Sequence, residues 1–358
     1  LKEYPGDVQL VVSDPAGGRL ALSVNRGGLS ELYVYDCATN EDRRIPTSPR
    51  GVVGAMEWFP STAELAYDLS SPEGQEVYRV DTDTGRSRRL TRSPTPPPAR
   101  TREPRLGRCR SSDGLVLPYW EYVPSSGTPK GTILNVHGGP EAQARPQFAA
   151  PTQFLVEEGW RVVLPNVRGS TGYGRTFTHL DDRRRRMDSV RDLQELVEHL
   201  VRDGKAERGR IGVMGGSYGG FMVLSSISTY PDLFQAAVCL VGISNFVTFL
   251  ENTGPWRRKL REAEYGSLES DREFLRSISP IEHASSIRAP LLVVHGRNDP
   301  RVPVSEAEQI VGTLRSLGRP VDLLVFDDEG HGVVRRPNRL VAWARAAEFF
   351  EQNLAHPP

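Results

Sequence analysis

The sequence predicts an α/β fold, with a mostly parallel sheet covered by helices on both faces, preceded by a smaller all-β segment. Three observations support this prediction. A repeat with a period of 45 residues occupies the first quarter of the chain, a proline-rich stretch follows it, and apolar strands then alternate with amphipathic helices. Such alternation over about 250 residues is typical of a parallel sheet covered by helices.

The N-terminal repeat aligns residues 4–48 with residues 49–93 without gaps. A period near 40–45 residues with about four short strands is typical of a β-propeller blade. Two unrelated hairpins with similar turns are the alternative, but the ungapped offset favours two blades of a partial β-propeller. Because closed propellers have about four to eight blades, we expect the chain to be the C-terminal part of a longer protein. Identical pairs include Tyr33 and Tyr78, Asp36 and Asp81, and Thr39 and Thr84.

A proline-rich segment separates the repeat from the rest of the chain. Four of the eight residues in 93–100 are proline, which favours extended backbone and is incompatible with a sheet interior. We therefore predict two blade-like repeats at 1–93, a linker at 94–105 and an α/β domain at 106–358.

Within the α/β domain, continuous apolar runs predict strands that are buried on both faces. An apolar stripe predicts a helix over 188–202. The basic run Arg183–Arg186 predicts a solvated loop or helix face, because nucleic-acid binding would need aromatic residues and more widely spread basic ones. The predicted strands are 131–136, 160–164, 210–214, 236–241, 290–295 and 321–326, and further helices are predicted at 304–317 and 339–354.

Composition argues against several functional classes. The chain has 45 basic and 45 acidic residues, so no net charge draws it to nucleic acid or to an anionic membrane. No apolar stretch approaches the ~20 residues that span a bilayer. Cys37, Cys109 and Cys239 are too far apart for a zinc knuckle, and they fit a reducing, cytoplasmic location. Because the chain begins at Leu1 rather than Met, the sequence leaves a signal peptide open.

The run Gly215–Gly220, Gly-Gly-Ser-Tyr-Gly-Gly, lies between a predicted strand and an apolar helix. This is the setting of a nucleophile elbow, in which a sharp turn presents a serine above the sheet. The alternative is a glycine-rich turn with an incidental serine. The context favours Ser217 as the nucleophile of a serine hydrolase.

A serine nucleophile needs a base and an orienting acid, which follow it in the order Asp or Glu, then His, in this class of fold. Asp299 follows the strand 290–295, and His331 follows the strand 321–326. His356 is the only other histidine after Asp299, and it lies three residues from the chain end. We therefore predict the triad Ser217, Asp299 and His331.

Two backbone N–H groups are candidates for the oxyanion hole, which stabilises the charge that develops on the substrate carbonyl oxygen. The first belongs to Tyr218, the residue after the nucleophile. The second comes from His137-Gly-Gly-Pro140, a glycine-rich loop after an early strand, for which a plain tight turn is the alternative.

From about residue 106 to 354 the chain resembles the catalytic domain of the prolyl oligopeptidase family of serine peptidases. This resemblance implies an α/β-hydrolase domain preceded by a β-propeller cap. The residue before the serine is Gly216, and in this the chain resembles the acylaminoacyl-peptidase branch. The dipeptidyl-peptidase branch tends to have Trp at this position. The matching motifs are His137–Pro140, Asn166–Gly174, Gly215–Gly220, Asn298–Arg301 and Glu329–Gly332.

The resemblance also implies roles for individual residues. Several relatives use a tyrosine hydroxyl in the oxyanion hole, whereas this chain has His137 at that place, so the second donor is expected to be the Gly139 N–H. Arg301 matches a position that binds a substrate backbone carbonyl, with a surface salt bridge as the alternative. The expected substrates are short peptides, no metal or other cofactor is required, and a homo-oligomer is left open.

Two rival functions remain at this stage. An esterase or lipase on the same fold would use the same triad and oxyanion hole, because a fold does not determine its chemistry. A non-catalytic protein-binding module made of a propeller and an inactive hydrolase is the other rival, and the intact triad argues against it.

Overall fold

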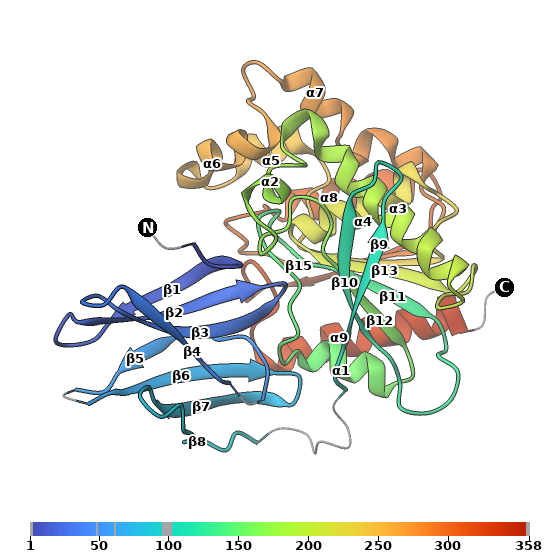
Figure 1. Ribbon diagram of the computed structural model, residues 1–358. Helices are drawn as coiled ribbons and strands as arrows, with labels where there is room; N and C mark the ends of the chain where they lie inside the picture. Colours follow the sequence, from blue (N-terminus) through green and yellow to red (C-terminus); the bar gives the residue numbers. More distant parts are fainter. Residues whose placement is uncertain (1–2, 48, 61, 95–101, 356–358) are drawn as a thin grey trace. The chain divides into compact units, whose positions relative to one another are not determined.

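The computed structural model describes residues 3–47, 49–60, 62–94 and 102–355, and the chain divides into two compact units (Figure 1). Unit 1 comprises residues 1–105, 145–157 and 171–176, and unit 2 comprises 106–144, 158–170 and 177–358. The prolines at positions 96–98, on which the predicted linker depends, lie outside the described residues, as does His356.

Unit 1 contains two four-stranded antiparallel sheets, with strand orders β1-β2-β3-β4 and β5-β6-β7-β8. The offset of 45 residues holds in the structure, because adding 45 to the bounds of β2 and β3 gives the bounds of β6 and β7. The strands are β1 (Asp7–Ser13), β2 (Arg19–Arg26), β3 (Leu29–Asp36), β4 (Glu41–Ile45), β5 (Met56–Trp58), β6 (Glu64–Ser71), β7 (Gly74–Asp81) and β8 (Ser87–Arg89).

The same turn follows the third strand of each sheet. Asp36 Oδ1 accepts the N–H groups of Ala38 and Thr39 at 2.9 and 3.0 Å. Asp81 Oδ1 likewise accepts the N–H groups of residues 83 and 84, both at 2.9 Å. These hydrogen bonds hold the pKa of both aspartates below its usual value. The repeated aspartate and threonine in the sequence thus encode a repeated Asx turn.

The two sheets of unit 1 share one hydrophobic core. Its members come from both repeats and include Leu32, Val34, Tyr67 and Val80, all buried. Tyr67 and Tyr78 stack with ring centroids 5.6 Å apart. Neither repeat therefore buries its apolar residues alone.

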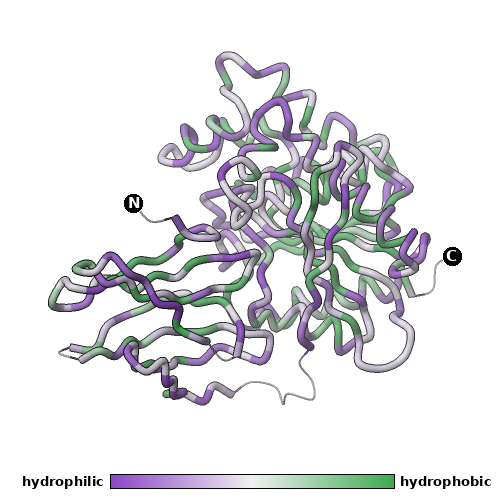
Figure 2. The backbone as a smooth tube through the Cα atoms, in the orientation of Figure 1, coloured by the Kyte–Doolittle hydropathy of each residue, from purple (hydrophilic) through white to green (hydrophobic). Residues whose placement is uncertain are grey.

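Unit 2 is built on an eight-stranded sheet with the order β16-β15-β14-β13-β11-β12-β10-β9. Strands β11 to β16 pair in parallel, and β10 pairs antiparallel with β12, so the expectation of a mostly parallel sheet is confirmed. Figure 2 shows hydrophobic residues concentrated along these strands. The strands are β9 (Arg105–Arg110), β10 (Val116–Tyr122), β11 (Thr132–Val136), β12 (Arg161–Pro165), β13 (Ile211–Gly216), β14 (Ala236–Leu240), β15 (Leu291–Gly296) and β16 (Val321–Phe326).

Helices pack on both faces of this sheet. Gly212 and Gly215 of β13 point to opposite faces, because they are three residues apart in a strand. A Cβ on Gly212 would meet Phe350 of α9, and a Cβ on Gly215 would meet Gly219 of α4. The helices are α1 (Ala150–Glu157), α2 (Arg175–Thr178), α3 (Arg186–Arg202), α4 (Tyr218–Thr229), α5 (Phe246–Asn252), α6 (Pro255–Tyr265), α7 (Arg272–Ser277), α8 (Ser305–Ser316) and α9 (Arg336–Phe350), with short turns η1 (Arg183–Arg185), η2 (Pro280–Ser286) and η3 (Glu351–Ala355).

Three helices between β14 and β15 were not predicted from the sequence. In α6 the apolar side chains do not form a buried stripe, since Trp256 and Leu260 are 69% and 61% exposed. Six of the eleven residues of α6 are charged, so its few apolar residues do not stand out as a stripe that would face a core. The predicted helix at 339–354 begins three residues earlier, at Arg336, with a proline in its first turn.

A buried glutamate ties α8 to the loop after β14. Glu306 is fully buried, and its carboxylate accepts the N–H groups of Ser244 and Asn245 at 3.0 and 2.8 Å. It also accepts the hydroxyl groups of Ser244 and Thr248. Removing it would leave several buried donors without an acceptor.

We expect Glu306→Ala to lower the free energy of unfolding by about 3 kcal/mol, because the buried donors lose their partner. Glu308→Ala, on the same helix but exposed, should change it by less than about 0.5 kcal/mol. Urea unfolding of both variants checks this, and equal effects would contradict it.

Candidate active site

Ser217 lies in the turn between β13 and α4. Its φ of 59° and ψ of −118° are values that L residues rarely adopt. The Ser217 N–H donates to Leu240 O at 2.9 Å, which ties the turn to the neighbouring strand. A Cβ on Gly219 would collide with the carbonyl oxygens of Val136 and His137. Glycine is therefore required for the turn to pack against β11, as in a nucleophile elbow.

The carboxyl ends of the neighbouring parallel strands line up at this edge of the sheet. Pairing aligns Gly216 with Leu240, Leu240 with Val294, and Gly296 with Phe326. The predicted nucleophile, acid and base follow the ends of β13, β15 and β16, respectively. All three therefore lie at the edge where sites in open α/β sheets form.

The structure brings the predicted acid and base together. His331 Nδ1–H donates to Asp299 Oδ2 at 2.7 Å, and the Asp299 side chain is fully buried while His331 is 14% exposed. The other Asp299 oxygen accepts the N–H groups of Arg301 and Val302 at 2.8 and 3.0 Å. A carboxylate only accepts, so the proton sits on Nδ1 and leaves Nε2 of His331 free to take another.

No hydrogen bond joins the Ser217 hydroxyl to His331 in the part of the chain that the structure describes. Catalytic hydrogen bonds often tighten only when a substrate binds. A second histidine, His295, lies 3.6 Å from Asp299 and donates its Nε2–H to Val302 O at 2.9 Å. Burial lowers the pKa of His295, so this ring stays neutral beside the acid.

The two predicted oxyanion donors belong to the residue after Ser217 and to a loop that lies beside Ser217. Tyr218 is the first residue of α4, so its N–H has no acceptor within the helix. A Cβ on Gly138 would lie 3.6 Å from Ser217 Cβ, which places the His137–Pro140 loop beside the nucleophile. Gly139 has a φ of 132°, and its carbonyl oxygen accepts from Arg261 Nη1 at 3.3 Å.

His137 is partly buried, and both of its ring nitrogens lie close to an oxygen atom. Its Nε2 lies 2.9 Å from Ser170 Oγ, and its Nδ1 lies 2.6 Å from Gly138 O. Burial lowers the pKa of His137. The Ser170 hydroxyl also donates to Val167 O at 2.6 Å. The loop that carries Gly139 is thus anchored to the motif Asn166–Gly174.

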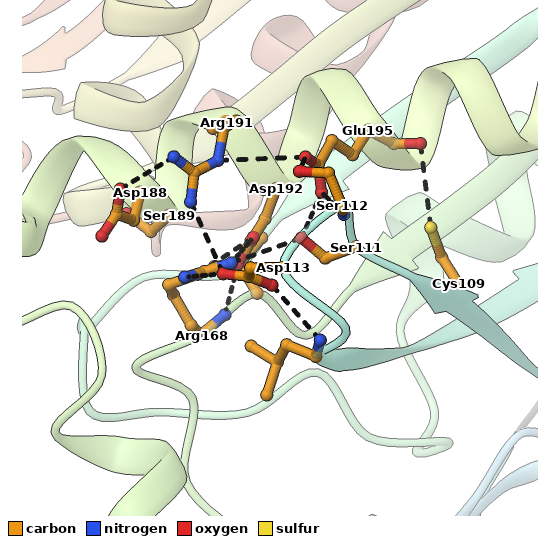
Figure 3. A network of polar contacts seen from close by, with 12 residues as sticks. Cys109, Ser111, Ser112, Asp113, Arg168, Asp188, Ser189, Arg191, Asp192 and Glu195 are labelled. Atoms are coloured by element: carbon orange, nitrogen blue, oxygen red, sulfur yellow. Dashed lines mark hydrogen bonds and ion pairs between the residues drawn. The ribbon is translucent and has the colours of Figure 1, made fainter.

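A buried ion pair fixes that motif (Figure 3). Arg168 is 6% exposed, and its guanidinium donates to Asp192 of α3 at 2.7 Å and to Asp113 at 2.8 Å. The Arg168 N–H donates to the same Asp192 carboxylate at 2.8 Å. These hydrogen bonds lower the pKa of Asp113 to about 2, while burial raises that of Asp192 to about 6.

Arg301 follows Asp299 at the sheet edge, and its side chain is exposed. Its carbonyl oxygen accepts from Thr253 Oγ1 at 2.8 Å, which ties the loop to the end of α5. In the described residues no ion pair holds the Arg301 guanidinium, so the alternative of a surface salt bridge is not supported.

The prediction for the basic run Arg183–Arg186 is wrong at one position. Arg183, Arg184 and Arg185 form the short turn η1, but Arg186 is fully buried and pairs with Asp181. A signal for this was present in the sequence, because Arg186 lies four residues before Val190, on the apolar stripe of α3. Helical spacing places such residues on one face.

A metal-binding group and a membrane-spanning helix are both absent from the described residues. No group of three or more His, Cys, Asp or Glu side chains gathers where it could hold a metal ion. No helix among them is long and apolar enough to cross a membrane.

Comparison with known proteins decides the family. The model of the prolyl oligopeptidase family matches residues 146–357. The chain belongs to the prolyl oligopeptidase family. This confirms the resemblance, inferred from the motifs, to a family of serine peptidases.

Relatives in the prolyl oligopeptidase family include dipeptidyl and acylaminoacyl peptidases. Dipeptidyl aminopeptidase BIII of Pseudoxanthomonas mexicana is 35% identical over 63% of this chain and 34% of its own length. The acylamino-acid-releasing enzyme of Arabidopsis thaliana is 31% identical over 62% of this chain and 30% of its own. The chain therefore spans about a third of the length of these curated relatives.

Solved structures of family members share the fold. A puromycin-hydrolyzing peptidase of Mycobacterium tuberculosis superposes with a TM-score of 0.89 and 27% identity, covering 97% of this chain and 54% of that one. The α/β-hydrolase domain expected from the resemblance is thus confirmed.

Glu264 of α6 is a buried acid close to the oxyanion loop. Its side chain is 7% exposed and accepts from Arg261, which also contacts Gly139. Burial raises the pKa of Glu264 to about 7, although Arg261 opposes the rise. The pKa of Glu264 is higher in the folded chain than in the unfolded chain. The contribution of this carboxyl group to stability is therefore complete below about pH 4.5 and is lost as the pH rises through about 7.

Glutamine cannot ionise, so Glu264→Gln should not lose stability as the pH rises. We expect the free energy of unfolding of Glu264→Gln, minus that of the wild type, to increase by about 2 kcal/mol from pH 5 to pH 8. Chemical unfolding at both pH values measures this difference. Glu269→Gln, at an exposed position, is the control and should show no such change. A constant difference between Glu264→Gln and the wild type at both pH values would contradict the assignment.

Proposed function

We propose that this chain is the catalytic part of a serine peptidase that cleaves short peptides through an acyl-enzyme. Ser217 is the nucleophile, His331 the general base and Asp299 the orienting acid. The observation that carries the proposal is the hydrogen bond between His331 and Asp299, 2.7 Å long, at the sheet edge where the strained Ser217 follows β13. The peptidase names of the relatives support the substrate class.

In the proposed mechanism, His331 Nε2 takes the Ser217 hydroxyl proton as the oxygen attacks the scissile carbonyl carbon. The N–H groups of Tyr218 and Gly139 stabilise the resulting oxyanion. Asp299 holds the Nδ1–H tautomer and stabilises the imidazolium. His331 then protonates the leaving amine, and water, activated by the same imidazole, releases the acyl group.

Arg301 is proposed to bind a backbone carbonyl of the substrate. Its exposed guanidinium lies two residues after the acid, and no ion pair holds it among the described residues. A peptide offers such a carbonyl at a fixed distance from the scissile bond, whereas a short ester does not. This residue therefore favours a peptidase over an esterase.

We also propose that residues 1–93 form two β-propeller blades, followed by a linker at 94–105 and the catalytic domain at 106–358. Two four-stranded antiparallel sheets with the same offset of 45 residues support the blades. The expectations of a cytoplasmic location and of no nucleic-acid or membrane partner stay predictions, and a homo-oligomer stays open.

Ser217→Ala is expected to lower kcat on peptide anilides by at least about 10⁴-fold, since the nucleophile is lost. It should also abolish labelling by a fluorophosphonate probe. Ser286→Ala, which changes an exposed serine, serves as the control and should keep both activities. A folded wild type that is not labelled at Ser217 would favour the non-catalytic binding module instead.

Arg301→Ala is expected to lower kcat/KM for acyl-peptide anilides about 10- to 100-fold, because a charge-assisted hydrogen bond to the substrate is lost. The same variant should hydrolyse p-nitrophenyl acetate as the wild type does. Steady-state kinetics on both substrates test this. An enzyme that turns over only the ester, with or without Arg301, would support the esterase alternative.

A further inference from the structure

The side chain of Tyr218 lies in a buried polar cluster behind the nucleophile. Tyr218 is 1% exposed, although its backbone N–H is the proposed oxyanion donor. Its hydroxyl donates to Asp181 Oδ2 at 3.0 Å and accepts from Arg186 Nη1 at 3.2 Å. Ser189 Oγ of α3 lies 2.8 Å from the same hydroxyl. Three polar groups therefore fix the orientation of the residue that follows the nucleophile.

Arg186 is itself held from several sides. It pairs with Asp181, and the side chains of the two are 0% and 1% exposed. Its Nη2 donates to Glu264 O at 3.1 Å. Its guanidinium lies over the rings of Tyr218 and Tyr265, 5.2 and 4.9 Å from their centroids. Because ion pair, hydrogen bonds and ring contacts converge, the guanidinium has one accessible position.

Asp181 also lies against the turn that supports the His137–Gly139 loop. A Cβ on Gly169 would collide with the Asp181 carboxylate, so this carboxylate lies against the backbone of the turn that carries Ser170. Ser170 in turn is 2.9 Å from the ring of His137, two residues before Gly139. The carboxylate thus links the supports of both proposed oxyanion donors.

The energetics of this pair do not favour a purely structural role. Burying two opposite charges costs several kcal/mol per ion before their attraction is counted, and apolar replacements are often equally stable. The pair is also incompletely satisfied, since Asp181 Oδ1 and Arg186 Nε are buried without a hydrogen-bond partner. The two charged side chains orient the Tyr218 hydroxyl by hydrogen bonds, which apolar side chains could not do.

We propose that Arg186 and Asp181 are positioning residues for the oxyanion hole. They hold the Tyr218 N–H through its hydroxyl, and they hold the His137–Gly139 loop through the turn at Gly169 and Ser170. Neither residue touches the substrate. This inference rests on the proposed function, because it assigns a role within that mechanism.

Four substitutions at three positions test the proposal, with one control. Tyr218→Phe removes one oxygen and keeps the ion pair, and we expect it to lower kcat about tenfold. Asp181→Asn and Arg186→Met should lower kcat about 100-fold, while KM stays within about twofold of the wild type. Arg186→Lys, which retains the charge, should recover part of the loss. Glu121→Gln breaks another ion pair that is largely buried, between Glu121 of β10 and Arg161 of β12, and it should leave kcat unchanged.

A second readout separates positioning from damage to the fold. A peptidyl trifluoromethyl ketone forms a tetrahedral adduct with the serine and places an oxyanion in the hole. Its inhibition constant should rise in Tyr218→Phe and Asp181→Asn by the factor by which kcat/KM falls, because both report the same stabilisation. Glu121→Gln should bind the ketone as the wild type does.

The outcomes distinguish the two levels of the proposal. If the wild type cleaves peptides through Ser217 and Tyr218→Phe retains the wild-type kcat and inhibition constant, the positioning role is wrong and the proposed function stands. Tyr218→Phe decides the matter even if the charge variants do not fold. If Ser217→Ala hydrolyses peptides as fast as the wild type, the proposed function fails and the positioning role fails with it.

Discussion

The sharp turn at Ser217 is the constraint on which the rest of the site depends. A serine at φ 59° is unfavourable by about 1–3 kcal/mol and persists only where its surroundings determine it fully. Here β13 and α4 are almost entirely buried, and the Ser217 N–H is bound to the next strand. The parallel register of the sheet then decides which loops lie beside the turn, so acid, base and oxyanion loop follow from strand order.

Much of the fold and of the site could be predicted from the sequence, because the decisive signals were local. The turn between the strand and the helix around Ser217 has glycines at 215, 216, 219 and 220, a pattern that few other turns require. Asp299 and His331 follow two apolar runs, at 290–295 and 321–326, that the sequence predicts as strands. The chain order of these residues then identified the triad candidates, without any knowledge of distances in space.

The residues that sequence reasoning missed act over long distances in the chain. Asp181 meets Tyr218 across 37 positions, and Arg168 meets Asp192 across 24. No spacing rule connects such pairs, and a basic run is usually solvated, so Arg186 was expected in solvent. Helix α6 was missed because six of its eleven residues are charged, and its Trp256 and Leu260 face outwards rather than into a core.

The exact offset between the two sheets of unit 1 also limits how this part of the chain can change in length. Joining residue 25 to residue 71 would delete 45 residues and leave one complete sheet with every side chain on its original face. A deletion of 44 residues at the same place would shift one strand by a single position and turn its apolar side chains to the opposite face. A change of one residue within a strand of this unit therefore exchanges the inside and outside of that strand, whereas loss of a whole repeat keeps every face.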